Sequence, residues 1–146
     1  DPLGESIKYK NGQYSEEIDI FEVFGKSSKE EKHRAYYAAV HRYQTPYVES
    51  LVNKKKYKLE NRYTKVNVSY DFYEDFHVYG FLWTPELLIW YLDGKEVFRR
   101  NNDFFKRPLH IIFDAEIMEV WDGLPKLQDL PSNFKIDYVR VWRKEE

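Results

Sequence analysis

The sequence of 146 residues contains no cysteine, one methionine, six glycines and six prolines. The absence of cysteine excludes a disulfide scaffold and a thiolate zinc site, and it leaves secretion open because a chain of this size can bury a core without cross-links. No apolar run approaches the roughly 20 residues that span a bilayer, so we expect no membrane span. The 23 basic and 25 acidic side chains leave a formal charge of −2, and we therefore expect no nucleic-acid partner.

Aromatic side chains are abundant. Four Trp, 13 Tyr and 10 Phe make up 18% of the chain. Such an excess is typical of β-sheet cores and of carbohydrate-binding surfaces, and it disfavours a purely helical fold. The length predicts a single domain over residues 1–146.

Apolar residues mostly recur with a period of two, which places alternate side chains on opposite faces of a β-sheet. The pattern predicts strands over residues 15–24 and 33–44. Four later segments continue the alternation, namely TKVNVSYD, DFHVYGFLW, RPLHIIFDAEI and NFKIDYVRVWR. With LLIWYLDGKEVFRR, these segments give about eight strands and no long helix, and so predict an all-β, two-layer sandwich.

Turn residues divide this pattern. Asp93-Gly94 stands between two β-rich runs, and because a type I′ turn needs positive φ at both central positions, it predicts a hairpin over residues 87–99. Residues 44–63 are the most loop-like stretch, since they hold Pro46, the basic run Lys54–Lys58 and little periodicity.

The most distinctive group of acidic side chains lies in the sequence EIDIFE, residues 17–22. Strict alternation places Glu17 and Asp19 on one face of a strand and Glu22 on the other. One extra residue, a β-bulge, would bring all three carboxylates to one face and turn the two isoleucines toward the core. Three carboxylates on one face repel one another; catalysis would explain why that cost is tolerated, and a solvated acidic face is the alternative.

EEIDIFE resembles the signature E-[IL]-D-[IVF]-x-E of glycoside hydrolase family 16, and DFHVYGFLWTPELLIWYLDGKEV and FKIDYVRVW resemble later strands of that family in the same order. The similarity extends from about Tyr14 to Trp142. It implies a two-sheet, concanavalin A-like jelly-roll of endo-acting hydrolases that cut β-linked glucans and galactans with retention of configuration. Carried over by position, it implies that Glu17 is the nucleophile, Glu22 the acid/base and Asp19 the assisting carboxylate, hydrogen-bonded to Glu17.

The same resemblance implies four substrate-binding residues. His41 ends a strand that lines the cleft in the family, which implies a contact with substrate or an acid/base contact, and Asp114 stands where the family usually has a cleft Asn. Glu116 shares a face with Asp114, and Trp121 is similar to a tryptophan that follows in the family. The alternatives are a structural role for His41 and a solvated sheet edge for Asp114.

We expect no required cofactor, and no metal ligand is assigned to the site. Family members often bind structural calcium away from the cleft, and Asp137 is a candidate ligand among the about 6–8 oxygens that calcium takes. Trp83, Trp90 and Trp142 alternate with core residues, which predicts packing rather than sugar binding. The run Lys54–Lys58 fits a solvated loop or, alternatively, a contact with a sulfated polysaccharide or a phosphate backbone.

The segments FDAE and WDGLP resemble marine-galactan enzymes such as agarases, porphyranases and carrageenases more than β-1,3-glucanases, whose corresponding stretch usually reads N-x-x-x-G-G. The resemblance therefore predicts a retaining endo-glycosidase acting on a marine-type galactan, in a secreted, cell-surface or periplasmic location. The alternatives are a β-1,3-glucanase of the same family and a jelly-roll that binds carbohydrate without turnover.

A family 16 domain normally has a substantial stretch before its catalytic strand, whereas Glu17 comes close to the start of this sequence. Residues 1–13 are too few to supply the outer strands. We therefore expect a partial catalytic domain that lacks its N-terminal strands. Its sandwich would be completed by a second chain, a swapped copy or a severed N-terminal segment, because uncovered strand edges and apolar faces favour pairing.

Overall fold

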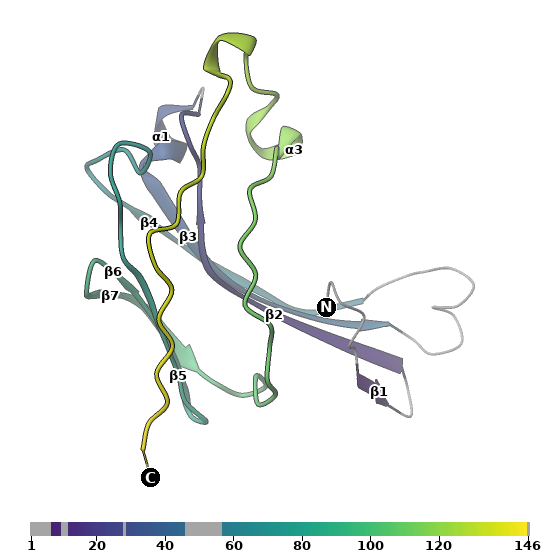
Figure 1. Cartoon of the computed structure of the whole chain (residues 1–146). Coiled ribbons are helices and arrows are strands. Elements are labelled where there is room, and N and C mark those ends of the chain that lie inside the picture. Colours follow the sequence, from purple (N-terminus) through teal and green to yellow (C-terminus); the bar gives the residue numbers. More distant parts are fainter. Residues whose placement is uncertain (1–6, 10–11, 28, 46–56, 146) are drawn as a thin grey trace. The chain divides into compact units, whose positions relative to one another are not determined.

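The computed structural model describes residues 7–9, 12–27, 29–45 and 57–145 (Figure 1). Contacts divide the chain into two units, Asp1–His110 and Ile111–Glu146, which are described separately. Within the described part, the first unit holds seven strands in two antiparallel sheets, against the about eight expected for the whole chain. This arrangement confirms the predicted all-β class.

The first sheet has the order β1-β2-β3-β4. Its strands are β1 (Ile7–Tyr9), β2 (Gly12–Val23), β3 (Ala35–Thr45) and β4 (Tyr57–Asn67), each antiparallel to its neighbour. The strands predicted from the alternation of residues 15–24 and 33–44 are confirmed by β2 and β3.

The strand β4 corrects the prediction that residues 44–63 are mainly loop. Pairing with β3 begins at Tyr57 opposite Gln44 and continues along the strand. The hydrogen bonds of a neighbouring strand stabilise extended backbone even where the side-chain pattern is weak, and charged side chains are tolerated on an edge strand. The part of the basic run at Lys54–Lys56 lies outside the described residues.

The second sheet has the order β5-β6-β7, with β5 (Tyr79–Trp83), β6 (Leu87–Leu92) and β7 (Lys95–Asn101). Asp93 and Gly94 join β6 to β7 with φ values of 49° and 77°. Both residues therefore have the positive φ that a type I′ turn needs, and the predicted hairpin is confirmed.

The core lies between the two sheets and consists of alternate residues of β3 and β6 together with two aromatic side chains from the connections. Its buried members are Tyr36, Ala38, Val40, Phe72, Leu88, Trp90, Leu92 and Phe105. Trp90 is completely buried and packs between Phe81 and Phe98, with ring centroids 4.8 and 5.0 Å away. The strands β3 and β6 thus each turn one set of alternate residues toward this core, as the period of two predicts.

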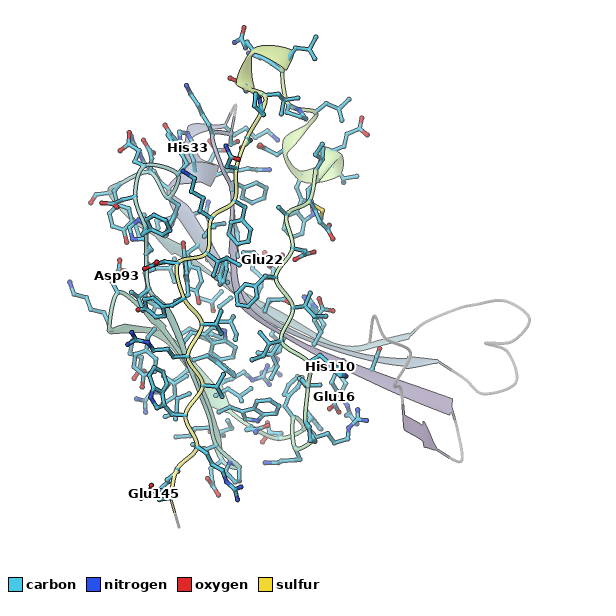
Figure 2. All side chains as sticks on the ribbon, in the orientation of Figure 1. Glu16, Glu22, His33, Asp93, His110 and Glu145 are labelled. Carbon is cyan, nitrogen blue, oxygen red and sulfur yellow. The ribbon has the colours of Figure 1, made fainter. Side chains whose placement is uncertain are left out.

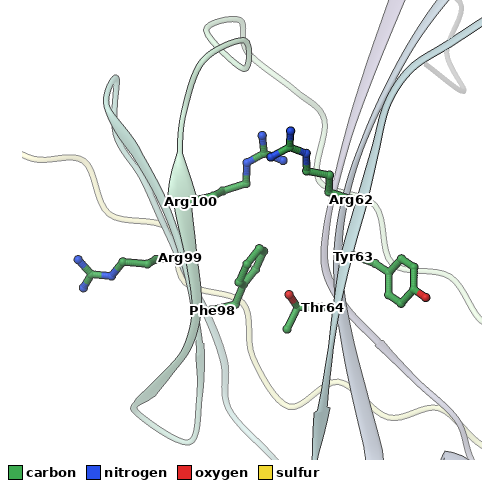
Figure 3. A pocket seen from close by; sticks show the side chains of 6 residues that line it. All are labelled: Arg62, Tyr63, Thr64, Phe98, Arg99 and Arg100. Atoms are coloured by element: carbon green, nitrogen blue, oxygen red, sulfur yellow. The ribbon is translucent and has the colours of Figure 1, made fainter.

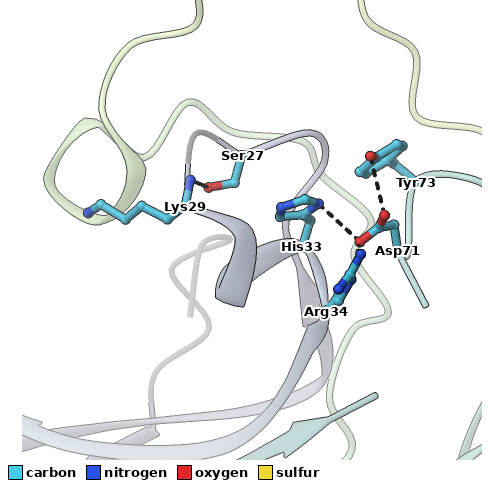
Figure 4. A network of polar contacts seen from close by, with 6 residues as sticks. All are labelled: Ser27, Lys29, His33, Arg34, Asp71 and Tyr73. Carbon is cyan, nitrogen blue, oxygen red and sulfur yellow. Dashed lines mark hydrogen bonds and ion pairs between the residues drawn. The ribbon is translucent and has the colours of Figure 1, made fainter. Parts of the chain in front are cut away.

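A polar network around Asp71 connects the short helix α1 (Glu30–His33) to the segment after β4 (Figure 4). Arg34 Nε donates to Asp71 Oδ1 at 2.8 Å, and His33 Nδ1 lies 3.2 Å from the same oxygen. The hydroxyl of Tyr73 donates to Oδ2 at 3.4 Å. The hydrogen bond from Arg34 is the main cause of a lowered pKa of Asp71, so this carboxylate stays charged and holds the loop.

The second unit contains the short helix α3 (Glu119–Asp122) and the 3₁₀ helix η1 (Leu127–Asp129). The strands predicted in RPLHIIFDAEI and NFKIDYVRVWR are not present as strands in the described residues 107–145. A strand is defined by hydrogen bonds to a neighbour, whereas alternation indicates only which side chains would share a face. The alternation in these two segments therefore indicated a strand tendency that the described residues do not show as strands.

Candidate active site

The strand β2 contains an irregularity at its acidic sequence. Asp19 pairs with Ala39 and Glu22 pairs with Tyr37, so three steps along β2 correspond to two steps along β3. One residue of β2 is therefore extra, which confirms the predicted bulge between Ile18 and Glu22. The odd spacing of Glu17 and Glu22 was the signal for it.

The register places the three predicted catalytic carboxylates on one face of the first sheet. Glu17 lies opposite His41, and Glu22 lies opposite Tyr37. Since His41 and Tyr37 are four residues apart on β3, their side chains share a face, and those of Glu17, Asp19 and Glu22 share it with them. The structure thus brings together four of the residues singled out from the sequence.

The opposite face of β2 belongs to the core. Ile18, Phe21 and Val23 pack against the buried cluster between the sheets. Ile18 therefore faces the core as predicted, whereas Phe21, rather than Ile20, continues the core-facing side. The physical reason is the bulge, which takes up one residue and shifts the alternation after Asp19.

The four side chains on the carboxylate face differ in exposure. Glu17 is exposed, and Glu22 is half-buried. The Oδ2 atom of Asp19 lies 3.1 Å from Nε2 of His41, and both side chains are mostly buried, with 16% and 17% of their surface exposed. The contact of Asp19 with His41 was missed from the sequence, and the expected hydrogen bond of Asp19 to Glu17 stays a prediction.

Two carbonyl groups at the bulge accept hydrogen bonds from buried aromatic side chains. The indole Nε1 of Trp90 donates to the carbonyl oxygen of Asp19 at 3.0 Å, and the Tyr36 hydroxyl donates to the carbonyl oxygen of Ile20 at 2.6 Å. Sequence reasoning missed both donors. The general tendency of buried Trp and Tyr to find a hydrogen-bond partner was the available signal.

Glu16 precedes Glu17 in the chain and faces the other way. Its side chain is 5% exposed, with Oε2 3.2 Å from Arg107 Nη2 and Oε1 3.7 Å from Arg42 Nε. The Arg42 guanidinium lies over the ring of Phe104 at 4.5 Å. Glu16 and Glu22 therefore lie on opposite faces of one strand, and both are labelled in Figure 2.

The other three predicted substrate-binding residues lie in the second unit. Asp114, Glu116 and Trp121 are all exposed there, and Trp121 belongs to α3. The structure describes that unit by itself, so the predicted place of these three residues in a cleft stays a prediction. The acidic character of Asp114 is compatible with a hydrogen bond to a sugar hydroxyl.

The three tryptophans that were expected to pack behave differently. Trp90 is completely buried, as predicted. Trp83 is 37% exposed, and its indole donates to the carbonyl oxygen of Phe105 at 2.8 Å. Trp142 is 79% exposed, and because the second unit is described by itself, its packing stays a prediction.

A pocket of about 520 Å³ lies between β4 and β7. Arg62, Arg99 and Arg100 contribute to its lining, and Figure 3 shows the guanidinium groups of Arg62 and Arg100 approaching each other from the two strands. Arg62 pairs with Val40, which belongs to the buried core side of β3. The pocket is therefore on the other side of the first sheet from the carboxylates.

No group of three or more His, Asp or Glu side chains is placed to hold a metal ion among the residues that the structure describes. Asp137 lies exposed in the second unit. Calcium binding at Asp137 therefore stays a prediction. In the same described part of the chain, no helix has the length and apolar character needed to cross a membrane.

A comparison with protein families matches residues 4–144 to the family described as "Beta-porphyranase A-D, GH16 domain". The match covers nearly the whole chain and spans both units. It therefore supports the family resemblance that the acidic motif and the two later motifs indicated.

Curated relatives are similar over shorter stretches. The glucan endo-1,3-beta-glucosidase A1 of Niallia circulans is 28% identical over 89 residues, covering 51% of this chain and 13% of that protein. The beta-glucanase of Rhodothermus marinus is 31% identical over 83 residues, covering 47% of this chain and 29% of that protein. The chain thus spans less than a third of the length of either relative.

Among solved structures, the kappa-carrageenase from Pseudoalteromonas carrageenovora in complex with an oligotetrasaccharide of kappa-carrageenan is 24% identical, with a TM-score of 0.48. The similarity covers 67% of this chain and 35% of that chain.

Proposed function

The chain belongs to glycoside hydrolase family 16, and on this premise we propose that it carries the catalytic strand of a retaining endo-glycosidase acting on a β-linked polysaccharide. The observation that supports the proposal most directly is the bulge of β2. It brings Glu22 to the face of Glu17 and Asp19, although a regular strand would turn Glu22 to the opposite face.

The proposed reaction is a double displacement. The carboxylate of Glu17 attacks the anomeric carbon while the carboxyl group of Glu22 gives its proton to the glycosidic oxygen, so the sugar–oxygen bond breaks and a glycosyl ester forms on Glu17. The Glu22 carboxylate then takes a proton from water, whose oxygen attacks the anomeric carbon. Glu17 leaves as a carboxylate, Glu22 regains its proton, and two inversions give net retention.

Glu22 must be protonated before the first step, and Glu17 must be ionised. Repulsion among the three carboxylates favours this division, because one proton shared by the cluster lowers its charge. The contact of Asp19 with His41 supports an orienting role for His41, which would hold Asp19 between the two glutamates.

We propose a galactan of the porphyran type as the substrate class, since the family description names porphyranases. A β-1,3-glucan is the second candidate, because the Niallia circulans relative is named as a glucan endo-1,3-beta-glucosidase. A direct comparison of hydrolysis on several polysaccharides distinguishes these two candidate substrates.

The test uses the full-length protein that contains this chain, with its Glu17→Gln variant as the control. Reducing ends are measured on porphyran, agarose, carrageenan and laminarin, and ¹H NMR follows the anomeric configuration of the first product. We expect release from a galactan with the β-anomer formed first, and no release by the variant. Binding without hydrolysis would support the carbohydrate-binding alternative, and release from laminarin alone would support a β-1,3-glucanase.

We further propose that strands outside these residues complete the sandwich, since the chain covers only 13% and 29% of the two relatives. They would come from a severed N-terminal segment, a second polypeptide or a swapped copy. Native mass spectrometry with sequencing of every chain in the active material tests this. A monodisperse monomer of 17.8 kDa with full activity would contradict it.

A location outside the cytoplasm is proposed as well, whether secreted, at the cell surface or in the periplasm. A polymeric substrate cannot cross a membrane, so an endo-acting enzyme has to meet it outside. Fractionation of the source cells, with the protein detected by antibody, tests this proposal.

A further inference from the structure

We propose that Trp90 and Tyr36 are positioning residues that set the spacing of the catalytic carboxylates by fixing the two carbonyl groups of the bulge. The inference rests on the proposed function for its catalytic consequence. Its structural part rests on the hydrogen bonds of Trp90 and Tyr36 to the carbonyls of Asp19 and Ile20.

A bulge leaves part of its backbone without partners in the sheet. Between Asp19 and Glu22, the register of β2 with β3 is broken, so the ladder does not supply every carbonyl with a donor. A buried carbonyl without a donor costs about 1–3 kcal/mol, which would favour a return to regular pairing. Donors from outside the ladder therefore decide whether the bulge persists.

The two donors reach the bulge from the interior. Tyr36 lies on the core-facing side of β3, and Trp90 lies on β6 in the opposite sheet, 71 residues from Asp19. In a regular strand, carbonyl groups point within the sheet toward neighbouring strands. The carbonyl groups of Asp19 and Ile20 accept hydrogen bonds from core side chains. They therefore point toward the core and not toward a neighbouring strand.

Both donors are held rigidly. Each is completely buried, and the Trp90 ring is packed against Phe81 and Phe98, while the Tyr36 ring lies 5.8 Å from that of Tyr79. Close packing restricts each ring to one position. The packed core between the two sheets thus serves as a fixed reference for the backbone of the catalytic strand.

The orientation of the two peptide groups sets where Glu22 points relative to Glu17. The peptide groups that carry the two carbonyls lie between these glutamates, so a rotation there moves one carboxyl group relative to the other. A retaining glycosidase needs the two carboxyl groups about 5–5.5 Å apart, and a displacement of about 1 Å can lower a rate by up to about a hundredfold.

Trp90→Phe tests the first hydrogen bond, with Trp83→Phe, at a partly exposed position, as the control for the loss of an indole donor. Both substitutions remove an indole that donates to a backbone carbonyl, but the acceptor of Trp83 is Phe105, outside the bulge. In the full-length protein we expect kcat to fall between about tenfold and a hundredfold in Trp90→Phe, with KM changed less than about twofold. Trp83→Phe should keep kcat within about twofold of the parent.

Tyr36→Phe tests the second bond by removing one hydroxyl, with Tyr79→Phe as its control. Tyr79 is also a core tyrosine, and its ring stacking on Phe21 is kept by phenylalanine. We expect Tyr36→Phe to lower kcat by about fivefold to tenfold. It should also alter the pH–rate profile, because the electrostatic interaction between the carboxyl groups depends on the distance between them. Tyr79→Phe should leave both unchanged.

Hydrogen exchange of the backbone amides provides a readout independent of activity. We expect the amides of Ile20, Phe21 and Glu22 to exchange about fivefold to tenfold faster in Trp90→Phe and Tyr36→Phe, but not in the two controls. Unchanged exchange at the bulge, or an unchanged kcat in an active parent, would overturn the inference. An inactive parent with faster exchange would overturn the proposed function alone and leave the structural part standing.

Discussion

Glu16 and Glu17 are neighbours in the chain and lie in opposite environments. Glu16 is enclosed between Arg42 and Arg107, whereas Glu17 is exposed on the face that carries Asp19 and Glu22. A carboxylate that is buried against cations stabilises one fold, and a carboxylate that stays accessible is available for chemistry. The alternation of a single strand thus separates a structural role from a proposed catalytic role.

Two carboxylates outside the acidic strand, Asp71 and Asp93, also hold parts of the fold together. Asp71 accepts from Arg34 and Tyr73 and holds the segment after β4. Asp93 accepts from the Val78 N–H at 2.9 Å and contacts His77 at 2.9 Å, which ties the hairpin turn to the start of β5. Glu16, Asp71 and Asp93 are here called the structural carboxylates, and Glu17, Asp19 and Glu22 the face carboxylates.

Glu17→Gln should give the largest effect on activity. The amide is nearly isosteric with the carboxylate but cannot form the glycosyl ester, so we expect hydrolysis to fall by at least about 10³-fold. Because Glu17 is exposed, the free energy of unfolding should change by less than about 0.5 kcal/mol. Reducing-end release and urea unfolding measure the two quantities, and turnover near the parent rate would defeat the nucleophile assignment.

Glu22→Gln should give the second-largest effect on activity, because it removes the general acid. We expect a loss of about 10²- to 10⁴-fold on polysaccharide and a smaller loss on aryl glycosides, whose leaving groups need little protonation. Azide should restore turnover of an aryl glycoside and give a β-glycosyl azide, identified by NMR. An α-linked azide would instead indicate an inverting mechanism.

Glu16→Gln should act on stability. Removal of one partner of a buried ion pair leaves the other charges uncompensated, and we expect a loss of about 3–5 kcal/mol in the free energy of unfolding. Glu86→Gln is a matched control at an exposed position and should change it by less than about 0.5 kcal/mol. Equal urea midpoints for the two variants would show that Glu16 is not a structural carboxylate.

Asp93→Asn should give the smallest effect, seen as a change in pH dependence. Burial raises the pKa of Asp93, but the Val78 N–H and His77 outweigh it, so the net pKa is lowered in the folded protein. A lowered folded pKa gives stability that is present above the unfolded value of about 3.9 and is lost as the pH falls through the folded value.

The variant should therefore be less stable than the parent at pH 6, and the two should converge as the pH falls below about 4. Asparagine tolerates the positive φ at this turn, so the substitution tests the charge rather than the backbone. Urea unfolding from pH 6 to pH 2 measures the difference, with Asp103→Asn as the exposed control. If the difference in the free energy of unfolding between the parent and Asp93→Asn stays constant across this pH range, the lowered pKa of Asp93 is contradicted.

Local regularities were sufficient for much of the fold and part of the site. The period of two identified β2 and β3, and the requirement for positive φ at Asp93 and Gly94 identified the hairpin. The odd spacing of Glu17 and Glu22 implied the bulge only together with the family resemblance, which gives both residues a role at one bond.

The alternation of apolar residues did not predict correctly where every strand lies. The first part of β4 has little alternation, yet pairing with β3 makes it a strand. Residues 134–143 alternate clearly and remain without strand pairing in the second unit. A hydrogen-bonded neighbour decides both cases, and no local pattern specifies which neighbour a segment will have.

The sequence by itself determined the alternation of β2 up to Asp19 and, through the odd spacing of Glu17 and Glu22, the need for an extra residue if both act on one bond. It did not determine that Phe21 rather than Ile20 continues the core-facing side. Only the tertiary structure decided that Arg42 and Arg107 enclose Glu16, that His41 contacts Asp19, and that the indole of Trp90 reaches the Asp19 carbonyl. Side-chain parity depends on adjacent residues, whereas buried hydrogen bonds and ion pairs depend on groups far apart in the chain. Their partners are fixed only when the two sheets pack together.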